Sequence, residues 1–139
     1  MKNKIFIFDL DDTLYKEIDF LYSAYREIAG WIELKFSLKG IYAFMLETYK
    51  EQVDVFSRLI DTYDLSLTKA DLLSIYRSHR PNIRLELDTL KALEVLKQDF
   101  ILGMITDGRS ITQRNKFQAL GLEQFIENEN LVISEEFGS

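Results

Sequence analysis

The sequence predicts an α/β protein: a parallel sheet of about three strands, interrupted by a long helical insertion. Three observations support this. Short apolar runs at residues 5–8 and 100–105 each end in polar residues, as the buried strands of parallel sheets do. Between them, residues 15–81 carry apolar side chains at three- and four-residue spacing, which is typical of amphipathic helices. A third expected strand, Leu131-Val132-Ile133-Ser134, follows a further helical stretch.

The first strand, residues 5–8, is expected to be buried on both faces and gives way at once to aspartates at 9, 11 and 12. Ligands of open α/β sheets bind at the carboxyl ends of strands. Asp9 and Asp11 would point the same way in an extended chain, where their charges repel unless a cation neutralises them. This favours a hard cation such as Mg²⁺. The alternative is an acidic turn that only caps the next helix.

Residues 15–81 are expected to form an all-helical unit whose apolar and aromatic stripe is bundle core. One helix follows Gly40 and spans residues 41–63. Another begins at Thr68, where Thr68-Lys69-Ala70-Asp71 resembles a capping box. The only proline of the chain ends this helix at or before Arg80. His79, the only histidine, is expected at the surface rather than as a catalytic base.

The second strand, residues 100–105, follows a helix for which Asp88 is the expected N-cap. The strand ends in Thr106-Asp107-Gly108, and Ser110-Ile111-Thr112-Gln113 resembles a capping box that starts the next helix. A hydroxyl at a strand end, a glycine turn and a helix amino terminus together form an anion site. Alone, this segment would be interpreted as a plain strand-to-helix turn.

The two motifs together resemble those of the haloacid dehalogenase superfamily, most of whose members are Mg²⁺-dependent phosphatases. Asp9-Leu10-Asp11-Asp12-Thr13-Leu14 after an apolar strand is similar to the first motif, and Thr106-Asp107-Gly108 to the second. The resemblance implies a Rossmann-like core at residues 1–14 and 82–139. It also implies that residues 15–81 are a helical cap that closes over the active site and selects the substrate.

By the same resemblance, Asp9 would be the nucleophile that takes up the phosphoryl group, and Asp11 the general acid/base. The Asp9 carboxylate and the main-chain carbonyl of Asp11 would hold Mg²⁺. Thr106 would bind the transferring phosphate through its hydroxyl, helped by the amides of Asp107 and Gly108. Carboxylates are competent nucleophiles towards phosphorus, and the rest of the catalysis is mostly positioning and charge neutralisation. The implied reaction is hydrolysis of a small phosphate monoester.

The family pattern continues past Ser139 into a lysine-containing third motif and an acidic fourth motif, so the resemblance implies a core that is truncated at its carboxyl end. Lys116 is one candidate replacement for the lysine, although its position in a helix favours the solvated face. The first strand would keep a bare apolar edge, and we expect a homo-oligomer or a partner chain there. The rival hypothesis is a non-catalytic remnant that binds or oligomerises. The helical block argues against a response-regulator receiver.

Composition argues against several other classes. A net charge of −6 without a Lys/Arg cluster argues against a nucleic-acid partner. The chain has no cysteine, which excludes disulfides and thiolate metal sites. No apolar run approaches membrane-spanning length, and the amino terminus does not resemble a signal peptide. We therefore expect a cytoplasmic protein that acts on a small phosphorylated metabolite.

Overall fold

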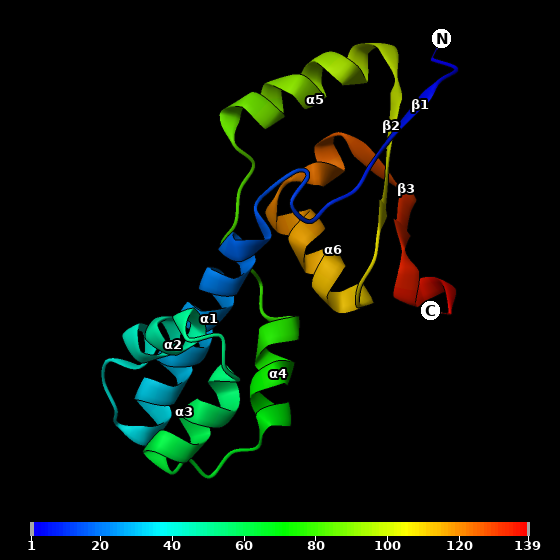
Figure 1. The fold of residues 1–139 in the computed structure, drawn as a ribbon. Coiled ribbons are helices and arrows are strands. Elements are labelled where there is room, and N and C mark those ends of the chain that lie inside the picture. The colour runs from blue at the N-terminus through cyan, green and yellow to red at the C-terminus, as the bar shows by residue number, and fades with distance from the viewer. Residues whose placement is uncertain (1, 139) are drawn as a thin grey trace. The chain divides into compact units, whose positions relative to one another are not determined.

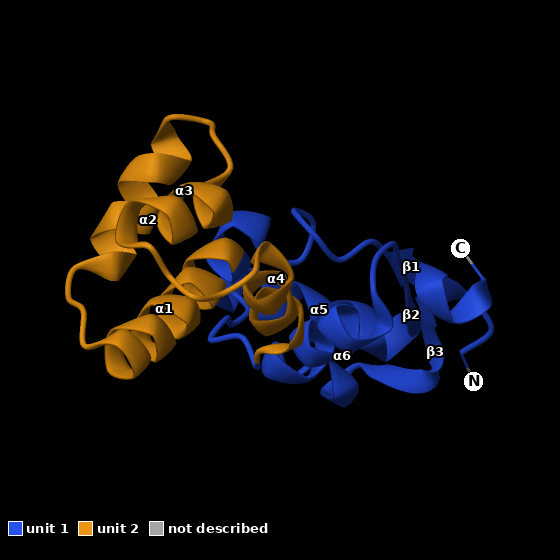
Figure 2. Ribbon diagram, turned by 90° about the horizontal axis from the view of Figure 1, so that it is seen from below, with its two compact units in different colours: residues 1–20, 80–139 blue, residues 21–79 orange. Residues whose placement is uncertain are grey.

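The computed structural model describes residues 2–138, which divide into two compact units (Figures 1 and 2). One unit, here the sheet unit, comprises Met1–Phe20 and Arg80–Ser139, and the other, the helical unit, comprises Leu21–His79. The strands are β1 (Ile5–Phe8), β2 (Ile101–Thr106) and β3 (Ile126–Ile133). The helices are α1 (Glu17–Phe36), α2 (Ile41–Lys50), α3 (Val55–Tyr63), α4 (Lys69–Ser78), α5 (Leu87–Asp99) and α6 (Ser110–Ala119), with short 3₁₀ segments η1 (Leu122–Gln124) and η2 (Ser134–Phe137).

The three strands form one parallel sheet in the order β1-β2-β3, which confirms the predicted fold class. Both connections step in the same direction along the sheet. Right-handed connections then place α5 and α6 on the same face, and Figure 2 shows both helices on one side of the strands. The third strand, Ile126–Ile133, is longer than the expected run at 131–134.

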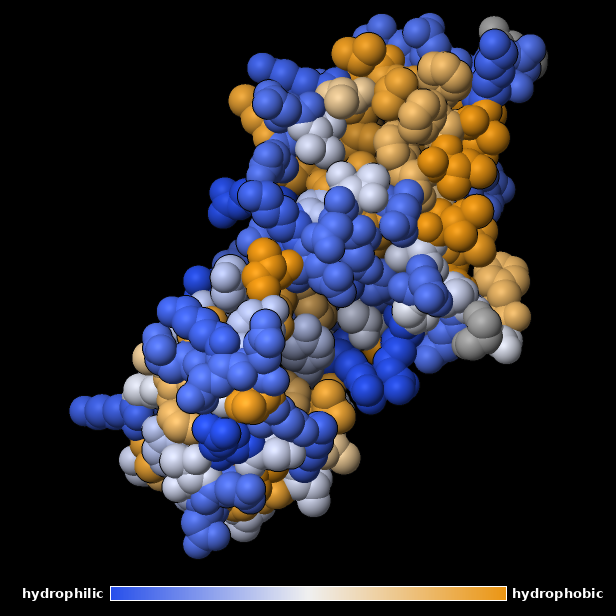
Figure 3. Space-filling view, viewed as in Figure 1, coloured by the Kyte–Doolittle hydropathy of each residue, from blue (hydrophilic) through white to orange (hydrophobic). Residues whose placement is uncertain are grey.

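The two faces of this sheet differ in burial. Towards the helices, Leu102 and Met104 are at most 2% exposed. On the opposite face, Ile5, Ile7 and Ile105 are 52%, 50% and 54% exposed, and Figure 3 shows hydrophobic atoms gathered over the strands. The expectation that β1 is buried on both faces is therefore wrong. Within residues 2–138, β1 pairs with β2 alone and nothing covers its outer face.

The helical unit has an apolar core, which confirms the interpretation of its stripe as bundle core. Its buried members come from all four helices and the turn after α3: Tyr25, Ile28, Ala29, Ile32, Ile41, Met45, Val55, Phe56, Leu59, Leu65 and Leu72. The single helix expected over residues 41–63 is two helices, α2 and α3. Gln52 has φ of 60°, which a helix does not accommodate, and the Asp54 carboxylate accepts the amide of Ser57 to start α3.

Some of the helix ends that the sequence predicts are confirmed, and others are wrong. At Thr68 the capping box is confirmed: Thr68 Oγ1 accepts the Asp71 amide at 3.2 Å, and Asp71 Oδ2 accepts the Thr68 amide at 2.9 Å. Helix α4 ends at Ser78, before Arg80, as predicted. For α5 the expected cap is wrong, because Glu86 is the N-cap and Asp88 lies in the first turn. There its carboxylate still complements the helix dipole.

The expected surface position of His79 is also wrong. Its side chain is 7% exposed, with Nε2 3.1 Å from Ser23 Oγ and Nδ1 2.8 Å from the Tyr76 carbonyl oxygen. These bonds satisfy both ring nitrogens inside the helical unit, so the histidine joins α4 to α1. Within residues 2–138, no helix has both the length and the apolar content that crossing a bilayer requires.

Candidate active site

The chain turns immediately after β1. The amides of Thr13 and Leu14 both donate to the Leu10 carbonyl, at 3.1 and 3.0 Å, and the Leu10 side chain is fully buried beneath the turn. Asp12 adopts φ of 60°, and its Oδ1 accepts the amide of Glu17 at the start of α1, at 2.8 Å. The alternative of an acidic turn that caps the next helix therefore applies to Asp12. It does not account for Asp9 and Asp11.

Asp9 lies at the carboxyl end of β1 with an exposed side chain. Its Oδ1 accepts the amide of Leu10 at 2.9 Å. The second carboxylate oxygen, Oδ2, has no hydrogen-bond partner in the part of the chain that the structure describes. One oxygen is thus held by the backbone while the other is open to a ligand, as a nucleophile or metal ligand requires.

Asp11 is half-buried and its carboxylate accepts three side-chain hydrogen bonds. Oδ1 accepts from the Tyr15 hydroxyl at 2.6 Å and from Lys116 Nζ at 2.8 Å. Oδ2 accepts from Gln113 Nε2 at 3.0 Å. Burial alone would raise the pKa of the Asp11 carboxyl, but these hydrogen bonds and the Lys116 charge outweigh it, so the pKa lies below its usual range.

Lys116 is 4% exposed, so the expectation that it lies on the solvated face is wrong. Besides its ion pair with Asp11, its Nζ lies 4.5 Å from the centroid of the Phe20 ring. The face of α6 that carries Lys116 and Phe117 packs inward, and both side chains are buried. The Asp11 carboxylate makes a buried ammonium tolerable, because a buried charge needs a partner.

Gln113 lies one turn before Lys116 and is 3% exposed. Its Nε2 donates both to Asp11 Oδ2 and to Thr106 Oγ1, the latter at 2.7 Å. The capping-box interpretation of this segment is wrong: Arg109 is the N-cap of α6. The Ser110 amide donates to Glu135 Oε1 at 2.9 Å. The Gln113 side chain is thereby left to bridge the ends of β1 and β2.

The Thr106-Asp107-Gly108 turn follows β2. Thr106 is 2% exposed, whereas Asp107 is exposed and its Oδ1 accepts from the Ser134 hydroxyl. The amide of Gly108 donates to Ser134 Oγ at 3.0 Å. Gly108 has φ of 143°, and a Cβ there would lie 3.1 Å from the Gln113 side chain, so any other residue would be strained and would press on Gln113.

The chain's own η2 segment therefore occupies amides at the amino end of α6. Glu136 fastens η2 to α6 through a bidentate pair with Arg114, with Nε–Oε2 and Nη2–Oε1 distances of 2.7 Å. These bonds lower the pKa of the Glu136 carboxyl and raise that of the Arg114 guanidinium. The Ser134 and Glu135 side chains accept the amides of Gly108 and Ser110, where the sequence predicts an anion site.

Of the residues predicted for the site, Asp11 and Thr106 are brought together through Gln113. Within residues 2–138, no hydrogen bond joins Asp9 to either of them. The sequence reasoning missed Tyr15 and Gln113 and misplaced Lys116. The sequence offered one signal that these two residues act together: Gln113 and Lys116 are three residues apart, so they share one face of a helix.

The site is compatible with a hard divalent cation. Asp9 Oδ1 accepts the Leu10 amide and keeps a further lone pair for a cation, and oxygen ligands are what Mg²⁺ prefers. The Asp11 carboxylate is engaged by three donors, so a contribution from that residue would come from its main-chain carbonyl. No group of three or more His, Cys, Asp or Glu side chains suited to a metal occurs among the described residues. Mg²⁺ commonly uses one or two carboxylates and completes its shell with water and substrate phosphate.

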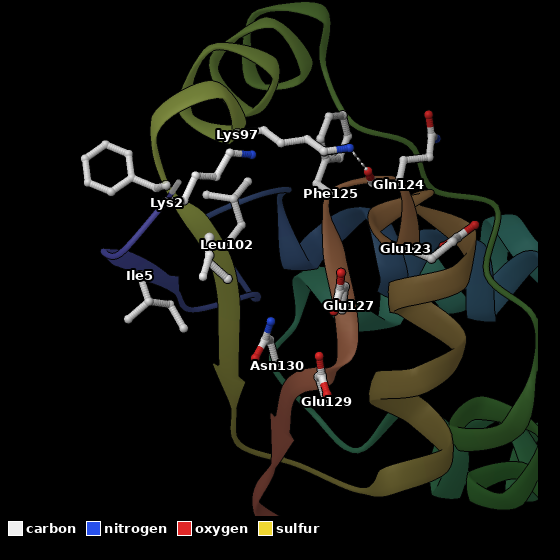
Figure 4. A pocket seen from close by; sticks show the side chains of 12 residues that line it. Lys2, Ile5, Lys97, Leu102, Glu123, Gln124, Phe125, Glu127, Glu129 and Asn130 are labelled. Carbon is white, nitrogen blue, oxygen red and sulfur yellow. Dashed lines mark hydrogen bonds between the residues drawn. The ribbon is translucent and has the colours of Figure 1, made fainter.

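A separate pocket lies at the opposite, amino ends of the strands (Figure 4). It has a volume of about 580 Å³ and is lined by residues that include Ile5, Leu102 and Glu127. Lys97 spans its rim and donates to the Gln124 carbonyl at 2.6 Å. None of the predicted site residues lines this pocket.

Comparison with known proteins decides the family. Residues 6–136 match the model of the haloacid dehalogenase-like hydrolases. The chain belongs to this family. Its sequence is 31% identical to a glyceraldehyde 3-phosphate phosphatase of Methanocaldococcus jannaschii, in an alignment that covers 95% of this chain and 62% of that enzyme. Membership suggests a divalent metal, usually Mg²⁺, as a cofactor.

Solved structures agree on the fold. The HAD-hydrolase YfnB from Bacillus subtilis, whose structure was determined bound to magnesium, aligns with a TM-score of 0.62 at 19% identity, over 99% of this chain and 66% of that one. A 2-haloacid dehalogenase from Pseudomonas syringae aligns with a TM-score of 0.56 at 20% identity, over 99% of this chain and 66% of that one. The chain thus spans slightly less than two thirds of the length of these relatives.

Proposed function

We propose that this chain is a Mg²⁺-dependent phosphatase, which hydrolyses a small phosphate monoester through an aspartyl phosphate on Asp9. The observation that carries the proposal is the open Oδ2 of Asp9, at the same sheet edge as the hydrogen-bonded Asp11 and Thr106. The phosphatase relative at 31% identity supports the reaction type.

In the first step, Asp9 Oδ2 attacks phosphorus and the bond from phosphorus to the alcohol oxygen breaks. The leaving oxygen takes a proton from the Asp11 carboxyl group. In the second step, the Asp11 carboxylate removes a proton from a water molecule, whose oxygen attacks phosphorus. The bond from phosphorus to Asp9 then breaks and inorganic phosphate leaves. Asp9 is again a free carboxylate, and Asp11 holds the proton taken from water, which it gives to the leaving oxygen of the next turnover.

Around the reacting phosphoryl group, Thr106 donates its hydroxyl hydrogen to a phosphate oxygen. Asp9 and the Asp11 main-chain carbonyl would hold Mg²⁺, which when bound neutralises the charges of carboxylate and phosphate. The three donors on Asp11 favour its ionised form, which suits proton removal from water. A leaving group that departs without a proton does not need Asp11 as a general acid in the first step. The helical unit is proposed to act as the cap that selects the substrate.

The test is hydrolysis of p-nitrophenyl phosphate, whose leaving group needs no proton, with and without Mg²⁺. Glyceraldehyde 3-phosphate serves as a second substrate, because the phosphatase relative is named for it. Asp9→Asn removes the nucleophile with little change of shape, and Asp99→Asn, at an exposed site at the end of α5, is the matched control. We expect metal-dependent turnover that Asp9→Asn abolishes and Asp99→Asn preserves. Turnover that survives Asp9→Asn, or its absence in folded wild type, would contradict the proposal.

A second candidate function is self-association, favoured by the open face of the sheet. Ile5, Ile7 and Ile105 are each at least half exposed on that face, and contiguous apolar surface of this kind marks interaction sites. We propose a second copy of the chain as the occupant. Sedimentation at increasing concentration tests this, with Ile7→Lys as the disrupting variant and Val95→Lys, at an exposed α5 site, as the control. A monomeric wild type at all concentrations contradicts it.

A further inference from the structure

Gln113 connects two segments that lie far apart in the sequence. Its Nε2 donates to Asp11 Oδ2 at 3.0 Å and to Thr106 Oγ1 at 2.7 Å. An amide nitrogen has two hydrogens, and both are used here. The reversed orientation would place the amide oxygen against a carboxylate that can only accept, so these contacts determine the direction of the amide group.

The bond from Gln113 also sets the direction of the Thr106 hydroxyl. A hydroxyl that accepts through its oxygen keeps one hydrogen to donate. Because Gln113 supplies the hydrogen between the two side chains, the Thr106 hydrogen must point to a different acceptor. A phosphate oxygen at the carboxyl edge of the sheet is such an acceptor. Gln113 therefore makes Thr106 a donor towards substrate.

Lys116 acts on the other oxygen of Asp11. Its Nζ lies 2.8 Å from Oδ1, which also accepts from the Tyr15 hydroxyl at 2.6 Å. The ammonium packs over the rings of Phe20 and Tyr15, at 4.5 and 5.9 Å from their centroids. With only 4% of Lys116 exposed, water has little access to this pair. Both Asp11 oxygens are thus held by inward-facing side chains of one helix, α6.

We propose that Gln113 and Lys116 are positioning residues, which hold the Asp11 carboxylate and the Thr106 hydroxyl in one fixed arrangement for phosphoryl transfer. The catalytic part of this inference rests on the proposed function. Neither residue is required to touch substrate, so each acts through the group that it holds. Misplacement of a reacting group by about 1 Å costs a factor of about 100 in rate, and we expect losses of that order.

The two residues should differ kinetically. Lys116→Met frees Asp11 alone and should lower kcat about 100-fold while leaving KM within about 2-fold. Gln113→Ala also frees the Thr106 hydroxyl, so it should lower kcat and raise KM. In an Asp11→Asn background, Lys116→Met should cause no further loss, because groups that act as one unit are not additive. Lys91→Met and Gln118→Ala, at exposed sites, are the matched controls.

An NMR experiment tests the arrangement without turnover. In wild-type protein the two side-chain amide hydrogens of Gln113 should exchange slowly with solvent, whereas those of exposed Gln118 should exchange fast. Asp11→Asn should shift one of the Gln113 signals, and Thr106→Val should shift the other. Both substitutions keep the shape of the side chain. Asp11→Asn also removes the charge that pairs with the buried Lys116, so its folding is checked from the dispersion of its spectrum, and Thr106→Val tests the Gln113 amide without that cost.

The outcomes separate the two proposals. If wild type lacks Mg²⁺-dependent turnover, the phosphatase proposal fails, and the Gln113 signals still decide the arrangement. If wild type is active but both α6 variants match their controls, the positioning role is overturned and the phosphatase proposal stands. The positioning role is also overturned if the Gln113 amide hydrogens exchange as fast as those of Gln118, or if neither substitution shifts their signals.

Discussion

The sheet unit and the helical unit bury different kinds of polar contact. In the helical unit, buried polar groups find partners closer in the sequence: Thr48 Oγ1 donates to the Phe44 carbonyl at 2.8 Å, and His79 contacts the Tyr76 carbonyl and, 56 residues away, the Ser23 hydroxyl. In the sheet unit, Gln113 and Lys116 are as deeply buried, but their common partner, Asp11, is 102 and 105 residues away. The contacts of the helical unit hold its helices together, whereas those of the sheet unit hold the side chains of the candidate site.

The units differ in their apolar surfaces as well. The helical unit encloses Ile28, Ile32 and Leu72 completely. The sheet unit leaves Ile7 and Ile105 about half exposed on the face away from α5 and α6. Substitutions of similar chemistry should therefore have unequal effects in the two units.

The largest effect on stability is expected where the long-range contacts converge. Asp11→Ala leaves the Lys116 ammonium buried without its carboxylate, and breaking a buried pair in this way costs about 3–5 kcal/mol. Asp9→Ala removes an exposed carboxylate and should change the free energy of unfolding by about 0.5 kcal/mol or less. Urea unfolding of both variants measures the difference. Equal losses would mean that the Asp11–Lys116 pair contributes nothing to the fold.

The next largest effect on stability is expected from a comparison of the closed core of the helical unit with the open face of the sheet unit. Leu72→Ala empties a fully buried site in the helical unit and should cost about 2–5 kcal/mol. Ile105→Ala, at a side chain that is 54% exposed, should cost less than half as much. Thermal and urea unfolding give both values. A loss at Ile105 as large as that at Leu72 would show that the open face is covered in solution.

The smallest effect is a pH dependence in the helical unit. The hydrogen bond from Lys69 lowers the pKa of Asp54 below 3.8, so this pair stabilises the fold above about pH 3.8 and its contribution disappears as the pH falls through the folded value. Exposed pairs are worth about 0.2–1 kcal/mol. Asp54→Asn keeps a good N-cap and should flatten the fall in melting temperature as the pH drops below about 3.8.

Asp61→Asn, at an exposed site on α3, is the control for that pH series. It should track the wild type across the whole range. If Asp54→Asn also tracks the wild type, the ion pair between Asp54 and Lys69 has no role in acid stability.

Much of the fold could be predicted from local patterns. The capping box at Thr68 depends on neighbouring residues and was correct, and so were the three parallel strands. Asp88 was wrong as a cap because two acidic residues, Glu86 and Asp88, stand near the same helix start. Spacing does not distinguish which of them stands at the N-cap position, where the Glu86 side chain makes no capping hydrogen bond.

The interior of the site could not be predicted in this way. Lys116 was expected in solvent because lysine is rarely buried without a partner, and its partner lies at the far end of the chain. Gln113 matched a capping pattern, but its amide is used by Asp11 and Thr106 instead. Local pattern carries no information about contacts over a hundred residues.

The most direct test of the central claim is to trap the covalent intermediate. Protein turning over a phosphate monoester with Mg²⁺ would be quenched in acid, and peptide mass spectrometry would locate the phosphoryl group. We predict phosphorylation on Asp9, absent in Asp9→Asn, and more of it in Asp11→Asn because the second step is slowed. A phosphoryl group on another residue, or none in active protein, would contradict the account.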